Sequence, residues 1–328
     1  MTRPFSQSLL LAAFLTLGAV QGRAQVSDEP IKLKTEIVLL DAQVAEKQTG
    51  AVIAGLTRND FVLYEDGVRQ EIEYFSFDQL PLSIILLLDV SPSTRPFIEK
   101  IQAGALQALE QLKPADEVAV MYYGGKAHLA QGFTRDRGAI VEAIVASGDK
   151  ALIQAVAGRG TAIKHGLYGA ARAIAELPPS KNRRAIIVIT DDISLPFGPS
   201  EKETSTLLFE SGAVVCGLLV QHTITRITRK MPSLSSVPLF NGGSRINPYV
   251  EKTGGDLLQA NADNVSEKFA VILNRLRTRY SLGYVPTNPV ENGKFRRIRL
   301  ALAEEARRKT VVIRAREGYF ARPRPESR

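Results

Sequence analysis

The sequence has few of the residues that usually carry covalent or redox chemistry. It holds one cysteine and three histidines in 328 residues. A single cysteine excludes an internal disulfide. Because Cys216 lies in the apolar run 213–220, we predict a small core side chain and not an exposed nucleophile. The histidines lack the mutual spacing of metal ligands, so we expect surface or packing roles for His128, His165 and His222.

Catalytic motifs are also incomplete. Ser147 and Lys150 have the Ser-x-x-Lys form and residues 252–254 have the Lys-Thr-Gly form of penicillin-recognising enzymes, but no Ser-Asp-Asn lies between them. A phosphoaspartate transferase of the haloacid dehalogenase type would need a second aspartate two residues after Asp89, where Ser91 stands. Gly-x-Ser-x-Gly and phosphate-loop patterns are missing as well. We therefore predict that the protein is not an enzyme.

A long apolar stretch lies near the amino terminus. Arg3 precedes the apolar stretch 9–20 and the sequence Gly-Arg-Ala that ends at Ala24, which is the layout of a secretory signal. The stretch is too short for a comfortable membrane span, and no later window is long enough. Without a cysteine in this segment, a bacterial lipoprotein anchor is excluded. We predict a signal peptide over 1–24 and a secreted or periplasmic mature protein with no membrane span.

Neither sign of charge dominates strongly. The net charge is +8, and removal of the predicted signal, which carries two arginines and no acid, leaves 8 minus 2, or +6. Much of this excess lies in the last third of the chain, at alternating positions typical of solvated strand faces. We therefore expect no nucleic-acid partner.

Oxygen-bearing side chains follow an apolar run that ends at residue 88. The run starts after Pro81 and is typical of a strand buried on both faces of a parallel sheet. Asp89, Ser91 and Ser93 follow at alternate positions, where such sheets place their ligands. Because hard divalent cations prefer oxygen ligands, these residues predict a cation site.

Two further oxygen ligands occur downstream. Thr161 lies on a loop that enters a helical pattern, and Asp191 follows a second buried strand pattern at 184–189. Three adjacent loops at one edge of the sheet would then direct five side chains to one ion. These predicted metal ligands are Asp89, Ser91, Ser93, Thr161 and Asp191.

The pattern of Asp-x-Ser-x-Ser, a loop threonine and Thr-Asp at a strand end resembles the von Willebrand factor A (VWA) domain and its metal-ion-dependent adhesion site (MIDAS). The resemblance implies that Ser91 and Ser93 bind Mg²⁺, or Mn²⁺ or Ca²⁺, directly. It implies that Thr161 binds directly or through water, and that Asp89 and Asp191 bind largely through waters. It also implies an open position for an exposed carboxylate of a protein partner.

Two residues differ from the family, which usually has glycine at both positions. Pro92 fixes φ and removes one backbone N–H. Asp192 adds a negative charge, which would tighten cation binding and weaken attraction for an acidic ligand. The segment 221–248 is basic without any acidic residue, and it is either a solvated loop or a guide for an acidic partner. The predicted partner-binding residues are Asp192, Arg226, Arg229, Lys230 and Arg245.

The two flanks of the chain have a different pattern from its centre. Residues 81–279 alternate strands and helices, which predicts a doubly wound, mostly parallel sheet. Residues 25–80 and 280–328 read as half-buried strands, with a hairpin signal at Asp66-Gly67. Since isolated hairpins are marginal, we expect both flanks to pair into one antiparallel unit. The expected fold class is therefore α/β, with a Rossmann-like VWA domain inserted into a small antiparallel β unit.

The flanks extend the resemblance. The segments 55–67, 280–289, 293–298 and 316–320, among them Tyr-Ser-Leu-Gly-Tyr-Val-Pro-Thr-Asn-Pro, look like the VWFA-related family common in acidobacterial genomes. We expect a secreted, non-catalytic adhesion or assembly module that captures an acidic group of a partner through its metal. The alternative is a secreted structural scaffold whose metal site is degenerate or only stabilises the fold.

Overall fold

The structure is a computed structural model that describes residues 37–158, 160–178, 180–220, 245–261, 263–304 and 310–321. The predicted signal peptide and three predicted partner-binding residues, Arg226, Arg229 and Lys230, lie outside the described residues. Within these ranges, no helix has the length and apolar character needed to cross a membrane.

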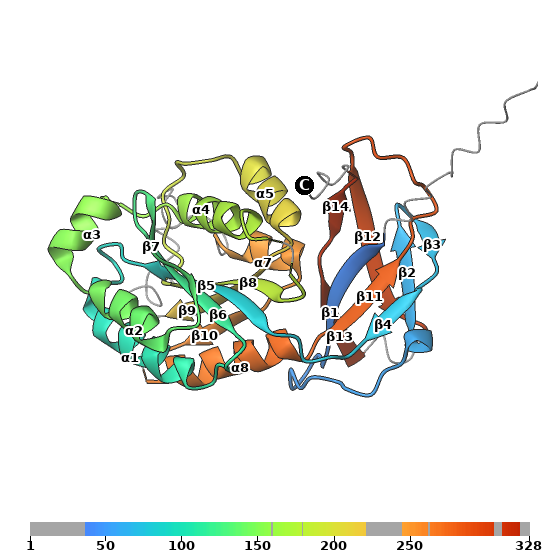
Figure 1. The fold of residues 1–328 in the computed structure, drawn as a ribbon, viewed down its shortest axis with the longest axis horizontal. Helices are drawn as coiled ribbons and strands as arrows, with labels where there is room; N and C mark the ends of the chain where they lie inside the picture. The colour runs from blue at the N-terminus through green and yellow to red at the C-terminus, as the bar shows by residue number, and fades with distance from the viewer. Residues whose placement is uncertain are drawn as a thin grey trace, which may run out of the picture. The chain divides into compact units, whose positions relative to one another are not determined.

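A six-stranded sheet with the order β10-β9-β8-β5-β6-β7 forms the centre of the α/β part (Figure 1). All neighbouring strands are parallel except β6 and β7, which are antiparallel. Every residue of β5 is buried, as the apolar run predicts. The predicted doubly wound, mostly parallel sheet is therefore confirmed. Its strands are β5 (Leu82–Asp89), β6 (Glu117–Tyr123), β7 (Ala127–Thr134), β8 (Arg183–Thr190), β9 (Val214–Val220) and β10 (Leu257–Ala260).

Helices cover both faces of this sheet (Figure 1). They are α1 (Ile98–Leu109), α2 (Arg137–Ala146), α3 (Lys150–Val156), α4 (Ile163–Ala175), α5 (Glu201–Ser211), α7 (Asn247–Thr253) and α8 (Val265–Arg277). One core joins α1, α2 and α8 to side chains such as Leu86 of β5, and the other joins α4, α5 and α7 to side chains such as Leu87. Successive strand residues point to opposite faces, so one strand supplies both cores. Cys216 is buried in the first core as predicted, and burial raises the pKa of its thiol to about 12.

Three elements of this domain are not evident from the sequence pattern: β7, α3 and α7. The strand β7 is half-buried along most of its length, so it lacks the continuous apolar run that marks the central strands. The helices α3 and α7 have 7 residues each, which is too short for a clear helical period.

Strands from both flanks interleave in two antiparallel sheets, with the orders β13-β1-β11-β4 and β14-β12-β2-β3. Each sheet contains strands that precede β5 and strands that follow α8, which confirms the predicted insertion. The predicted boundaries at 81 and 279 lie between β4 and β5 and between α8 and β11. The strands are β1 (Val38–Glu46), β2 (Phe61–Glu65), β3 (Val68–Gln70), β4 (Tyr74–Ser76), β11 (Tyr280–Tyr284), β12 (Phe295–Leu302), β13 (Val311–Ala315) and β14 (Gly318–Phe320).

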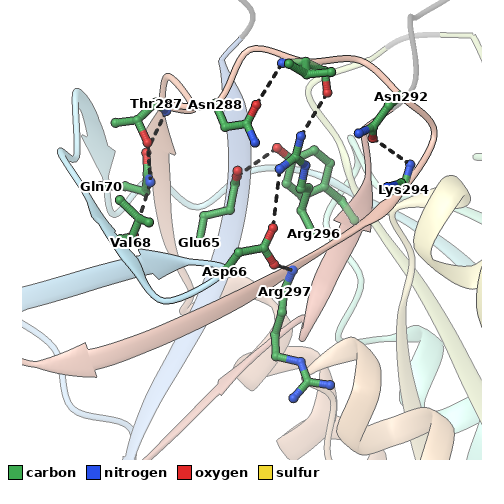
Figure 2. A network of polar contacts seen from close by, with 12 residues as sticks. Glu65, Asp66, Val68, Gln70, Thr287, Asn288, Asn292, Lys294, Arg296 and Arg297 are labelled. Atoms are coloured by element: carbon green, nitrogen blue, oxygen red, sulfur yellow. Dashed lines mark hydrogen bonds and ion pairs between the residues drawn. The ribbon is translucent and has the colours of Figure 1, made fainter.

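The hairpin between β2 and β3 turns at Asp66-Gly67, where both φ angles are positive, as the turn signal predicts. Figure 2 shows how polar contacts tie this hairpin to the carboxyl-terminal flank. The Asp66 carboxylate accepts a hydrogen bond from the Arg297 N–H at 2.9 Å and lies 3.5 Å from Nη1 of Arg296. Gln70 donates to the Thr287 hydroxyl and accepts from its N–H, both at 3.0 Å. These long-range bonds add to the pairing of β2 with β12, which joins the two flanks within one sheet.

A buried arginine connects β8 to the β unit. Arg183, the first residue of β8, donates to the carbonyl oxygens of Arg277 and Arg279, both at 2.8 Å. It also donates to the Ser281 hydroxyl at 3.1 Å, and its Nε lies 3.5 Å from a carboxylate oxygen of Asp41. The amino edge of the central sheet is thus joined to strands of both flanks, which leaves the carboxyl edge for the site.

Candidate metal centre

Asp89 is the last residue of β5 and only 1% exposed. Its Oδ1 accepts a hydrogen bond from the Ser91 N–H at 3.0 Å. Its Oδ2 accepts from the Tyr123 hydroxyl at 2.9 Å and from the Thr190 hydroxyl at 2.7 Å. Tyr123 and Thr190 end the neighbouring strands β6 and β8, so three adjacent strands meet at this carboxylate. All three donors are neutral, so none of them supplies a positive charge to compensate the carboxylate.

The pKa of Asp89 differs from that of an exposed aspartate. Burial raises the pKa of Asp89, and the negative charge of Asp191 raises it further, to about 6. Hydrogen bonds from Ser91 and Thr190 act in the opposite direction. A carboxylate in this setting gains from a nearby positive charge more than an exposed carboxylate would.

The loop after β5 places the two serine hydroxyls side by side. The Oγ atoms of Ser91 and Ser93 are 3.0 Å apart. The Thr94 hydroxyl donates to the carbonyl oxygens of Asp89 and Ser91, at 2.8 and 2.9 Å, and this fixes the turn. The backbone bond of the turn runs from the Thr94 N–H to the Ser91 carbonyl. It does not need an N–H at Pro92, so proline is compatible with this loop.

Thr161 is held by the loop that follows β8. Its hydroxyl donates to the Ile193 carbonyl at 2.9 Å, and its own carbonyl accepts from the Leu195 N–H at 2.9 Å. The next residue, Ala162, donates its N–H to the Gly124 carbonyl at 2.8 Å, which joins the loop that carries Thr161 to the end of β6. A hydroxyl oxygen that has donated its proton still offers lone pairs, so Thr161 retains the capacity to bind a cation.

Asp191 belongs to the same network of loops. Its Oδ1 accepts from the Ile193 N–H at 3.1 Å, so Ile193 contacts both Asp191 and Thr161 through its backbone. The effect of its charge on Asp89 shows that the two carboxylates are electrostatic neighbours. The structure thus brings the loops of all five predicted ligands to one edge of the sheet. Their assignment as metal ligands stays a prediction.

Asp192, in the loop after β8, is buried. Its φ of 62° is in the left-handed region, which glycine adopts freely and aspartate tolerates, so a glycine preference at this position has a backbone cause. Its Oδ1 accepts from the N–H groups of Arg245 and Ile246 at 2.9 and 3.0 Å, and the residue is 5% exposed. The Asp192 carboxylate thus binds the backbone of residues 245 and 246, and its role in partner binding stays a prediction. Arg245 is half-buried beside it.

The available donors fit a hard divalent cation. They comprise the two carboxylates Asp89 and Asp191 and the three hydroxyls of Ser91, Ser93 and Thr161, all of them oxygen. The described ranges contain no group of three or more histidines, cysteines, aspartates or glutamates that could hold a metal ion. A cation at this edge would therefore need the hydroxyl oxygens as well as the two acids.

Sequence reasoning missed Tyr123 as a partner of Asp89. The signal was present, because Tyr123 ends the predicted strand 117–123 and is paired with Asp89 in the parallel register. A polar tip at the end of an apolar strand, beside the strand that carries the candidate ligand, is the pattern to look for.

Residues 84–193 match the family model of the von Willebrand factor type A domain. No curated protein matches the chain. Similar solved structures include BatB from Bacteroides thetaiotaomicron, with 19% identity, 60% of this chain and 98% of that chain covered, and a TM-score of 0.44. The vWF domain of the type V pili tip protein Mfa5 from Porphyromonas gingivalis has 11% identity, coverage of 60% and 95%, and a TM-score of 0.42. Proximal thread matrix protein 1 from the mussel byssus, with a zinc-occupied MIDAS motif, has 14% identity, coverage of 60% and 48%, and a TM-score of 0.42. Over residues 84–193, the chain is thus similar to the von Willebrand factor type A domain.

Proposed function

We propose that this protein is a non-catalytic protein-binding module that uses a divalent cation, Mg²⁺ or else Mn²⁺ or Ca²⁺, to capture a carboxylate of a partner. The observation that carries the proposal is the setting of Asp89. Its carboxylate is buried, has neutral donors at both oxygens, and lies near a second carboxylate, Asp191. Buried negative charge of this kind is stabilised by a bound cation.

The five ligands have two different roles in this proposal. Ser91, Ser93 and Thr161 provide neutral oxygen atoms for direct contact, and Asp89 and Asp191 provide the negative charge. The cation, when bound, would supply a positive centre for the carboxylate of a partner. Hydrogen bonds of the chain itself fix the turn at Ser91 and Ser93, join Asp89 to Thr190, and join the Thr161 loop to the loop after β8, so the ligands are held before any ion arrives.

The motif fragments that suggest catalysis have structural roles. The Ser147 hydroxyl donates to the Ile144 carbonyl at the end of α2, at a distance of 2.6 Å. The Thr253 hydroxyl donates to the Tyr249 carbonyl at 2.8 Å and accepts from the Val215 N–H at 2.9 Å. These bonds cap a helix and join α7 to β9, which supports the non-catalytic proposal.

The structural alternative, in which the metal only stabilises the fold, makes a different prediction. A purely structural metal would leave its ligands without partners when removed, and chelation would unfold the protein. The Asp89 carboxylate already has three hydrogen-bond donors. We therefore expect the fold to persist in chelator, which favours a binding role.

The first experiment measures metal affinity. Calorimetric titration of the full chain with Mg²⁺ and Mn²⁺ should show one site, and Asp89→Ala and Ser91→Ala should each weaken it by at least about tenfold. Ser211→Ala is the matched control, because it removes another buried serine hydroxyl, which donates to the Leu208 carbonyl at the end of α5, just before β9 starts at the amino edge. An absence of metal binding by the wild type, or an equal loss in the control, contradicts the proposal.

The second experiment tests carboxylate capture. Water-proton relaxation by bound Mn²⁺ should fall when N-acetylglutamate amide, which has one carboxylate, displaces a water from the ion. Asp89→Ala should abolish the change. If the probe leaves the relaxation of the wild-type complex unchanged, the protein binds metal without capturing carboxylates, and the structural alternative stands.

We also propose export to the periplasm or the medium. The support is the sequence pattern of residues 1–24, which lie outside the described residues. Amino-terminal sequencing of the protein from an exporting host should find a start near Gln25. An intact amino terminus on protein kept inside the cell contradicts this proposal.

A further inference from the structure

The loops around the candidate metal centre keep their acids inside and their bases outside. The loops at 90–97, 124–126, 157–165 and 191–200 meet at the carboxyl edge of the central sheet. Asp191 and Asp192, the acidic residues in these described segments, are each 5% exposed. Among the described residues of these segments, three have long basic side chains: Arg95 at the start of the short helix 95–97, Lys126 in the loop after β6, and Lys164 in the first turn of α4. Arg95 and Lys126 are exposed and Lys164 is half-buried. We name Arg95, Lys126 and Lys164 the basic rim.

Each residue of the basic rim is connected to a loop of the metal centre. Arg95 follows Ser93 by two residues. The Lys126 N–H donates to the Ala157 carbonyl at 2.9 Å, at the start of the loop that carries Thr161. Lys164 follows Thr161 by three residues, and its Nζ donates to the Pro196 carbonyl at 3.2 Å in the loop after Asp191. The three residues of the basic rim are thus close, along the chain or through a hydrogen bond, to the segments that carry the predicted ligands.

Charge at this edge depends on the metal. Among the described residues at this edge, the carboxylates of Asp89, Asp191 and Asp192 carry three negative charges, and Arg245 and the basic rim carry four positive charges, which is a net +1. A divalent cation would raise this to +3. A single carboxylate bound to the ion would still leave +2 uncompensated, whereas a ligand with several carboxylates would meet the ion and the rim together.

We propose, on the basis of the metal-dependent function above, that the site selects an acidic polypeptide segment with several neighbouring carboxylates. One carboxylate binds at the metal, and others lie against Arg95, Lys126 and Lys164. When the metal is absent, the net charge counted over these described residues falls from +3 to +1, and the attraction of the edge for acidic ligands weakens. Metal loading therefore controls both coordination and electrostatic attraction.

The test compares two probes on Mg²⁺-loaded full-length protein: N-acetylglutamate amide, with one carboxylate, and acetylated, amidated hexaglutamate, with six. Competition titrations in about 0.05 M salt keep screening low. The wild type should bind hexaglutamate more tightly than the sixfold statistical factor allows. The triple variant Arg95→Ser, Lys126→Ser, Lys164→Ser should lose about tenfold in hexaglutamate affinity and keep its affinity for the single carboxylate and for Mg²⁺.

A matched control removes one arginine and two lysines from the amino edge of the same domain. Lys113, Arg135 and Lys181 are exposed there, and their replacement by serine should leave hexaglutamate affinity within about twofold. Equal losses in both triple variants would reduce the effect to net charge and overturn the proposal. An oligonucleotide of six phosphates that binds more tightly than hexaglutamate would also overturn it.

The outcomes separate this proposal from the one on which it rests. If Mg²⁺ and the single carboxylate bind but hexaglutamate gains no more than the statistical factor, the metal-dependent function stands and the basic rim has no part in it. If the wild type binds no Mg²⁺, the metal-dependent function itself fails.

Discussion

Buried carboxylates at the two edges of the central sheet are held in opposite ways. At the amino edge, Asp116 is fully buried and is bound by both Nη atoms of Arg277, at 2.5 and 3.1 Å. Asp256 is bound there by Arg275 at 2.7 Å. At the carboxyl edge, Asp89 is bound by hydroxyls and one N–H, none of them charged. One edge therefore neutralises its acids internally, and the other holds a charge that suits a cation from outside.

The pKa shifts of these acids follow the same division. Burial alone would raise the pKa of Asp116, but hydrogen bonds from Arg277 and from the N–H groups of Leu82 and Lys113 hold it below its ordinary value. Burial and a neighbouring carboxylate raise the pKa of Asp89 to about 6. Burial of an acid is therefore not by itself the mark of a site. The charge of its partners decides whether the acid is structural or suited to a ligand.

The largest effect should come from breaking the amino-edge pair. Arg277→Ala would leave Asp116 buried without its cation, and we expect the free energy of unfolding to fall by about 3–5 kcal/mol. Urea unfolding followed by circular dichroism measures this change. Arg172→Ala is the control, because its ion pair with Glu176 is exposed on both sides, and no measurable loss is expected. A loss in Arg277→Ala no larger than in the control would remove the contrast between the edges.

At the carboxyl edge, the matching change should cost little stability and remove the response to metal. In chelator, Asp89→Asn removes a buried charge near Asp191 and replaces the carboxylate by an amide of similar shape. The free energy of unfolding should therefore change by no more than ~1 kcal/mol. With Mg²⁺ at one hundred times its dissociation constant, the wild type should gain about 2.7 kcal/mol and the variant nothing. A variant as unstable as Arg277→Ala in chelator would show that Asp89 is structural.

Acid should weaken the amino edge in a defined direction. The pKa of Asp116 is lower in the folded protein than in the unfolded chain, so its contribution to stability is present above its ordinary pKa. This contribution is lost as the pH falls through the lower, folded-state value. Urea midpoints measured from pH 7 to pH 3 should therefore fall, and Asp116→Asn should flatten the curve at its acid end. Parallel curves for the variant and the wild type would contradict this account.

The comparison also shows how far the sequence could predict the molecule. Asp89 and Asp191 were predictable as neighbours because each follows a buried strand, and parallel strands present their carboxyl ends at one edge. The pair of Arg277 with Asp116 spans 161 residues, and no local pattern distinguishes this arginine from Arg275, the other arginine of α8. The interleaved order of the flanking strands was not predictable either, since alternation fixes the buried face of a strand but not its neighbour.

Asp192 is the position where the sequence and the structure differ most informatively, because its charge and its hydrogen bonds can be separated. Asp192→Asn keeps a side-chain oxygen for the N–H groups of Arg245 and Ile246 and tolerates a φ of 62°, so stability should stay near that of the wild type. Asp192→Ala loses both bonds and keeps the unfavourable φ, and it should be less stable by about 1–2 kcal/mol.

Asp192→Gly should lie between these two variants, because it loses the bonds but accepts the left-handed backbone. If the Asp192 charge reaches the metal, Asn and Gly should weaken Mg²⁺ binding by the same small factor, about threefold, and strengthen binding of hexaglutamate. Calorimetry on the pair decides this. Unchanged Mg²⁺ affinity in Asp192→Asn would mean that the charge of Asp192 does not act on the metal. The side chain would then contribute only its hydrogen bonds to the N–H groups of Arg245 and Ile246.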